Sequence, residues 1–87
     1  MHDINQLTGR QIAAARALLG LSQTELAEQA SISAPTLRRM EASTGHASGY
    51  VNNVIAVRQA LESAGISFLA DGETVDGGPG VRLRQAG

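Results

Sequence analysis

Apolar residues recur three or four positions apart in four parts of the chain, the spacing that places side chains on one face of an α-helix. These parts run from Thr8 to Gly20, from Ser22 to Ser31, from Ser33 to Ala42 and from about Tyr50 to Gly65. At positions 66–70 and 81–84 the pattern changes to alternation, on either side of a glycine-rich segment. This change predicts two short strands joined as a hairpin. We therefore expect a mainly α-helical protein with a short C-terminal β-hairpin.

Each of the first three expected helices begins with a residue that suits a helix start. Thr8 and Ser22 are each followed three residues later by a glutamine or a glutamate, which is the capping-box pattern. Ser33 precedes the third helix, and Pro35 lies in its first turn, where no amide hydrogen bond is lost. The helix boundaries therefore rest on local chemistry as well as on apolar spacing.

The composition excludes several classes of protein. At 87 residues the chain has room for one domain with a modest core, and without cysteine it has no disulfide and no thiolate metal site. His2 and His46 have no second ligand at metal spacing, so we expect no metal and no cofactor. Serine, histidine and aspartate residues occur, but their arrangement does not suggest a nucleophile with its base. We therefore expect that the protein is not an enzyme. No apolar run could cross a bilayer and no signal segment is evident, so we expect a cytoplasmic protein without membrane contact.

The formal charge of −1 is unusual for a protein that binds nucleic acid. The seven basic residues are all arginine, however. Arg10, Arg16, Arg38 and Arg39 lie in the first half of the chain, whereas the acidic residues from Glu62 onward lie towards its end. This distribution permits a basic face on a nearly neutral molecule.

The second and third helices are separated by a tight turn at Ser31, which is the arrangement of a helix-turn-helix. The exposed side of the third helix is expected to carry Ala34, Pro35, Thr36, Arg38 and Arg39. An arginine can donate two hydrogen bonds to guanine or bind a phosphate, and Gln23 lies at a helix start, where a phosphate is favoured. These positions predict binding in the major groove of double-stranded DNA.

The same region resembles the Cro/C1-type (xenobiotic-response-element-like) helix-turn-helix family of bacterial and phage regulators. The matching residues are Arg16, Leu18 to Leu21 (LLGL), Ser22, Gln23, Leu26, Ala27, Ile32, Ser33, Leu37 and Glu41. The resemblance implies a compact, lambda-repressor-like bundle of four or five helices that binds a specific DNA sequence, usually as a dimer, and controls transcription. Two positions depart from the family pattern. Ser31 stands where glycine is usual, which implies either a slightly different turn or backbone strain, and Ala34-Pro35 offers no hydrogen-bonding side chain to a base.

The resemblance also assigns roles to individual residues. It implies that Gln23 contacts a phosphate and that Ser33 and Thr36 lie near the DNA backbone. It places four residues at or near base edges: Ala34, Pro35, Arg38 and Arg39. Arg16 and Glu41 would form an ion pair that fastens the first helix to the third, a structural role. Because Ala34 and Pro35 lack hydrogen-bonding side chains, direct readout would depend on the two arginines.

We divide the chain into a flexible arm at residues 1–7, a DNA-binding domain at 8–65 and a hairpin at 66–87. An isolated two-stranded hairpin is only marginally stable, so its apolar side chains need a cover. The residues concerned are Ile66, Phe68, Val81 and Leu83. They could pack on the fourth helix, or they could meet a second hairpin across a twofold axis. The outward alternation of Arg82 and Arg84 favours the second arrangement, a homodimer on a palindromic site with recognition helices roughly 34 Å apart.

Two functions from different classes fit these observations. The first is a sequence-specific transcriptional regulator, a repressor that acts by occluding DNA and needs no small-molecule ligand. The alternative is a protein-interaction module, an antitoxin-like protein or adaptor that uses the bundle and the hairpin without reading DNA. The helix-turn-helix residues favour the first function.

Overall fold

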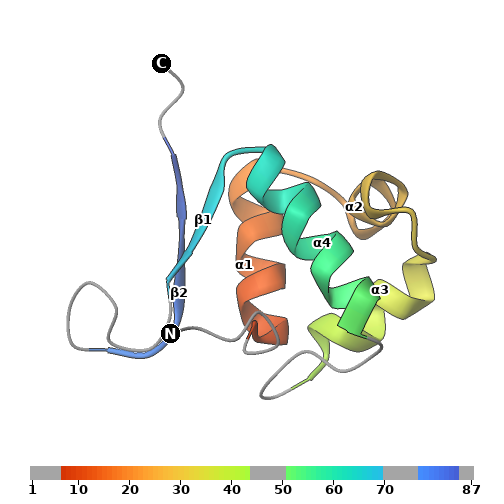
Figure 1. The fold of residues 1–87 in the computed structure, drawn as a ribbon, viewed down its shortest axis with the longest axis horizontal. Helices are drawn as coiled ribbons and strands as arrows, with labels where there is room; N and C mark the ends of the chain where they lie inside the picture. The colour runs from red at the N-terminus through yellow and green to blue at the C-terminus, as the bar shows by residue number, and fades with distance from the viewer. Residues whose placement is uncertain (1–6, 44–50, 70–76, 85–87) are drawn as a thin grey trace.

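The computed structural model describes residues 7–43, 51–69 and 77–84, and within these it contains four helices and one two-stranded sheet (Figure 1). The helices are α1 (Gly9–Leu19), α2 (Gln23–Ala30), α3 (Ala34–Glu41) and α4 (Val51–Ser63), and the strands are β1 (Ile66–Leu69) and β2 (Gly80–Leu83). The hairpin stands at one end of the molecule and α2 and α3 at the other, with α1 and α4 between them. The mainly helical fold with a terminal hairpin is thus confirmed.

The predicted helix starts are present, with the expected side-chain bonds. Thr8 Oγ1 accepts a hydrogen bond from the Gln11 amide at 3.0 Å, and the Gln11 side chain accepts one from the Thr8 amide at 2.9 Å. Ser22 and Glu25 form the same reciprocal pair at 3.1 and 2.9 Å. The hydrogen bonds from Ser22 lower the pKa of the Glu25 carboxyl below its usual value. These interactions depend only on residues three positions apart, so the sequence alone predicts them.

The turn between α2 and α3 keeps left-handed geometry at Ser31, with φ 59° and ψ 41°. Ser31 is the one described non-glycine residue with a positive φ. For a residue with a Cβ this conformation costs about 1–2 kcal/mol. The turn is held by the hydrogen bond from the Ile32 amide to the Ala27 carbonyl at 3.0 Å. The strain expected from the replacement of glycine is therefore present.

The core is a single cluster of aliphatic side chains contributed by every helix and by the hairpin. Its largest fully buried side chains are Leu7, Ile12, Leu26, Leu37, Met40, Val57, Leu61 and Ile66. Two of these lie outside the segment 8–65 that we predicted as the helical domain. Leu7, which we placed in the flexible arm, is only 2% exposed, and Ile66, which we placed in a separate hairpin unit, is 0% exposed. The arm and the hairpin therefore both contribute to the core of the helical domain.

The two strands pair antiparallel, from Ile66 opposite Leu83 to Leu69 opposite Gly80. β1 contacts α4 and β2 contacts α1. Besides the buried Ile66, both Phe68 and Val81 pack against the core. The inner face of the hairpin thus packs on its own chain, which is the first of the two predicted arrangements, and the meeting of two hairpins across a twofold axis stays a prediction. Of the four predicted interface residues, Leu83 alone remains well exposed, at 44%.

A buried amide joins the hairpin to the start of α1. Gln11 is only 6% exposed, and its Nε2 donates to the carbonyl oxygens of Leu69 at 3.1 Å and Gly80 at 2.8 Å. Because its Oε1 already accepts from the Thr8 amide, both ends of the side-chain amide are satisfied. The sequence indicates only the capping role of this residue.

The start of α1 also lies against the end of α3, and glycine is needed at this contact. A Cβ on Gly9 would collide with the carbonyl oxygen of Met40 and would lie 2.9 Å from that of Ser43. Both neighbours are backbone atoms, which cannot rotate away. The position of α3 relative to α1 thus depends on the absence of a side chain at residue 9.

We predict that Gly9→Ala lowers the free energy of unfolding by about 1–3 kcal/mol, the usual range for an overpacked contact. Urea unfolding followed by circular dichroism measures this change. Gly78→Ala is the matched control, because a Cβ there meets nothing within 4 Å, and it should change stability by less than about 0.5 kcal/mol. Equal stability of the two variants would contradict the close contact.

Candidate nucleic-acid interface

Helices α2 and α3 are held together by small and aliphatic side chains. Ala27 and Ala30 of α2 are 2% and 7% exposed, and Leu37 and Met40 of α3 are fully buried. Side chains of alanine size permit the close approach that the crossing requires. Since these buried positions take up one side of α3, its other side faces outward, at the end of the molecule away from the hairpin (Figure 1).

The last residue of α3 is fastened to α1 by a two-pronged ion pair. Arg16 Nε lies 3.0 Å from Glu41 Oε2, and Arg16 Nη2 lies 3.1 Å from Glu41 Oε1. Arg16 Nη1 also donates to the Leu21 carbonyl at 3.1 Å. The carboxylate is nearly buried, with a side-chain exposure of 7%. One guanidinium thus joins α1, the turn that follows it and the end of α3.

Gln23 lies on the same carboxylate. Its Nε2 donates to Glu41 Oε1 at 3.1 Å, a contact between helices for which neither the local sequence nor the family pattern gave a signal. An amide nitrogen carries two hydrogens, and Glu41 uses one of them. The side chain that the family pattern assigns to a phosphate is therefore held in place by Glu41.

The outward side of α3 begins at its capping serine. Ser33 Oγ accepts from the Thr36 amide at 3.2 Å and lies 2.7 Å from Thr36 Oγ1, which in turn accepts a long hydrogen bond of 3.5 Å from Arg39 Nη2. Pro35, Arg38 and Arg39 are exposed. Among the described residues, the two arginines therefore present a positive edge along α3.

Two of the predicted contact positions are less accessible than expected. Ala34 and Thr36 are half-buried, and Ala34 packs against the core. The front of α3 therefore consists of Ser33 and Pro35 in its first turn and of Arg38 and Arg39 one turn later. The side chain of Ala34 contributes to packing as well as to this surface.

Comparison with protein families assigns this arrangement. Residues 12–50 match a family model described as Helix-turn-helix. This part of the chain is a helix-turn-helix domain of the Cro/C1 type. The matched segment includes most of α1 and all of α2 and α3, and thus every residue of the Arg16–Glu41 contact. A search of curated proteins found no match.

The family match supports a DNA-binding regulator. Within the described residues, no helix is long and apolar enough to cross a membrane, and no group of three histidine, cysteine, aspartate or glutamate side chains could hold a metal. His2 and His46 lie outside these residues.

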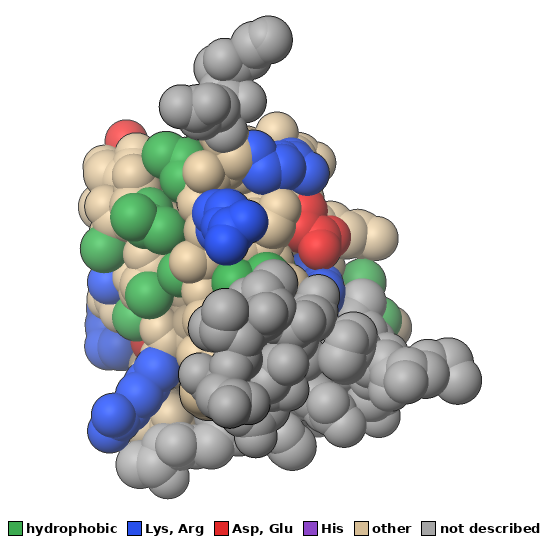
Figure 2. Space-filling view, turned by 90° about the vertical axis from the view of Figure 1, so that its left-hand side faces the viewer, with side chains coloured by type: hydrophobic (Ala, Val, Ile, Leu, Met, Phe, Trp, Pro, Cys, Tyr) green, Lys and Arg blue, Asp and Glu red, His purple; other side chains and the backbone are tan. Residues whose placement is uncertain are grey.

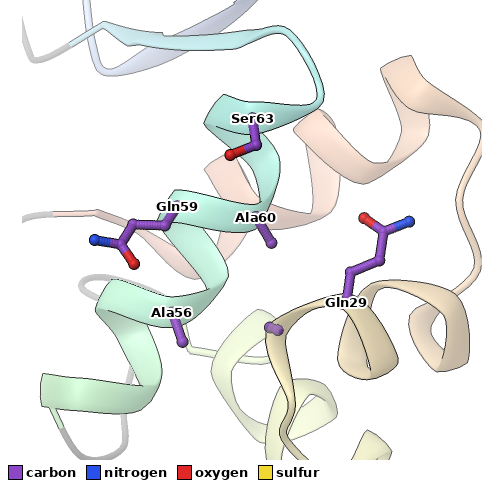
Figure 3. A pocket seen from close by; sticks show the side chains of 6 residues that line it. Gln29, Ala56, Gln59, Ala60 and Ser63 are labelled. Carbon is purple, nitrogen blue, oxygen red and sulfur yellow. The ribbon is translucent and has the colours of Figure 1, made fainter.

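The helix-turn-helix domain also has a hollow between α2 and α4 (Figure 3). Its volume is about 410 Å³, and it is lined by Gln29, Ala30, Ala56, Gln59, Ala60 and Ser63. None of these side chains is charged, and none belongs to α3. The hollow therefore contains none of the residues that we predict to contact DNA.

We predict that Glu41→Gln destabilises the helix-turn-helix domain by about 1–3 kcal/mol, because it leaves the Arg16 guanidinium without its countercharge in a largely enclosed site. Thermal and urea unfolding measure the loss. Glu62→Gln serves as the control: Glu62 pairs with Arg58 at 3.1 Å, but its side chain is 41% exposed. Such a helical surface pair is worth only about 0.3–0.5 kcal/mol. Equal losses in the two variants would contradict a special role for Glu41.

Proposed function

We propose that this protein is a transcriptional repressor that inserts α3 into the major groove of a specific DNA sequence. The observation that carries the proposal is the division of charge on α3. Glu41, its acidic residue, is bound to Arg16 and Gln23, whereas Arg38 and Arg39 lie exposed on the outer side of the helix. The helix thus presents cations to a polyanion while its own carboxylate is neutralised.

The residues of this surface take different roles in the proposal. Arg38 and Arg39 bind guanine edges or nearby phosphates through their guanidinium groups. Pro35 and the half-buried Ala34 can contact only apolar groups such as a thymine methyl. Ser33 and Thr36 lie at the backbone, and Gln23 donates its remaining amide hydrogen to a phosphate at the start of α2. Two arginines thus supply most of the sequence discrimination.

Repression by occlusion follows from this arrangement, because bound protein blocks its site without needing a ligand. A helix of eight residues with two base-reading side chains recognises only a short half-site. We therefore propose that two copies occupy a palindromic operator, which multiplies the discrimination of one copy.

Selection of bound sequences from a random DNA pool tests the proposal. We expect an enriched motif and an affinity that falls steeply with salt concentration, since phosphate contacts release counterions. Arg39→Ala should relax specificity at one base pair, at a cost of about 1–3 kcal/mol. Arg82→Ala, on the hairpin at the opposite end of the molecule (Figure 1), is the control and should leave the motif unchanged. Selection without enrichment would favour the protein-interaction alternative.

The number of copies bound has its own measurement. On a duplex carrying the full selected motif, sedimentation equilibrium should give two protein chains per DNA, and on a duplex carrying half of a palindrome it should give one chain with much weaker binding. A motif without twofold symmetry, bound by one chain, would contradict the palindromic operator and leave DNA readout by α3 intact.

A further inference from the structure

The outer edge of β2 carries backbone groups without partners among the described residues. The Arg84 amide donates to the Gly65 carbonyl across the hairpin at 2.7 Å. In an antiparallel pair, the backbone groups of successive residues point alternately towards the partner strand and away from it. The backbone amide and carbonyl of Arg82 therefore point towards β1, whereas those of Val81 and Leu83 point away from it. No hydrogen bond joins those outward groups to any described residue. An open strand edge of this kind is a template for another strand.

An apolar hollow lies between this edge and the neighbouring helix α1. Its volume is about 390 Å³, and it is lined by Thr8, Arg10, Gln11, Ala14, Pro79, Gly80 and Val81. Leu18 of α1 and Leu83 of β2, exposed by 48% and 44%, are two of the three exposed large hydrophobic residues of the described chain. Figure 2 looks onto the hairpin end of the molecule and shows apolar side chains gathered along one side of this face, beside arginines.

The charges at this edge are positive. Arg10 lines the hollow, and Arg82 is exposed on the outer face of β2. Neither side chain forms an ion pair or hydrogen bond with another described residue. By contrast, Arg58 pairs with Glu62, and Arg84 donates to the Glu62 carbonyl. The edge therefore combines unpaired backbone groups, apolar surface and two cations without counterions in the described structure.

We propose that the β2 edge binds an extended acidic segment of a partner protein, which adds to the hairpin as a third strand. The main chain of the segment would pair with Val81 and Leu83, its apolar side chains would enter the hollow beside Ala14, and a carboxylate on its other face would lie beside Arg82. The charge of the edge selects an acidic partner. β2 lies at the opposite end of the molecule from the first turn of α3 (Figure 1), so the same protein could hold DNA and a partner together.

A second copy of this chain fits the edge poorly. Pairing Val81 with Leu83 of a second β2 would set the two Arg82 residues directly opposite each other, and like charges in that position are destabilising. Pairing Val81 with its own counterpart would instead place Pro79, which has no amide hydrogen, opposite Leu83. Both registers are unfavourable, whereas a glutamate or aspartate opposite Arg82 is attractive.

The test uses synthetic eight-residue peptides and isothermal titration calorimetry with the full chain. A peptide of alternating valine and glutamate should bind, whereas the peptide with lysine in place of glutamate should not, and methylation of alternate backbone nitrogens should abolish binding. Leu83→Pro, which removes one outward amide hydrogen, should weaken binding roughly tenfold. Leu83→Val, which keeps that hydrogen, should change it little. Arg82→Glu should reverse the preference between the two peptides.

Circular dichroism of each variant checks that the fold is kept, and DNA affinity should be the same for all three variants. Several outcomes would overturn the proposal: no saturable binding of the acidic peptide, equal binding of both peptides, or binding that Leu83→Pro and Arg82→Glu leave unchanged. A dimer in sedimentation that Leu83→Pro dissociates would assign the edge to a second copy. Loss of DNA affinity in Arg82→Glu would assign its charge to nucleic acid.

Discussion

The carboxylate of Glu41 is the point at which three helices meet. It accepts two hydrogen bonds from Arg16 of α1 and one from Gln23 of α2, and Glu41 is itself the last residue of α3. A carboxylate so enclosed is stable only with its countercharge and donors in place. Because these donors come from two other helices, the orientation of α3 is set by directional bonds as well as by apolar packing. A helix that reads base edges needs such control, since hydrogen bonds to bases depend steeply on geometry.

This arrangement also explains how a chain with a net charge of −1 can match a helix-turn-helix family over residues 12–50. Net charge sums all residues equally, whereas DNA meets only the outward ones. Glu41, the acidic residue of α3, is paired with Arg16 inside the domain, whereas Arg38 and Arg39 lie exposed on its surface. Of the other arginines, Arg58 is paired with Glu62, and Arg82 and Arg84 lie on or directly after β2. Local charge, placed by tertiary contacts, therefore matters more here than the total.

The sequence predicted those features that depend on residues close together in the chain. The capping boxes at Thr8 and Ser22 and the left-handed turn at Ser31 are of this kind, because each is complete within four or five residues. The family pattern added the approach of Arg16 to Glu41. The second role of Gln11 could not be predicted, since it depends on where the hairpin lies, and the burial of Leu7 likewise depends on tertiary packing. Apolar alternation shows that a strand has an inner face, but it does not tell whether the same chain or another one covers it.

The bonds of Gln11 have a consequence for the order in which the protein folds. The amide reaches carbonyl groups 58 and 69 positions away in the sequence, and closing such long loops is entropically expensive and slow compared with forming local helical turns. The helices can therefore form early, but the face of α1 that carries Gln11 stays exposed to water until β2 has formed. During synthesis on the ribosome, the Gln11 amide can reach the carbonyl groups of Leu69 and Gly80 only after β2 has emerged, long after the residues of the Arg16–Glu41 contact.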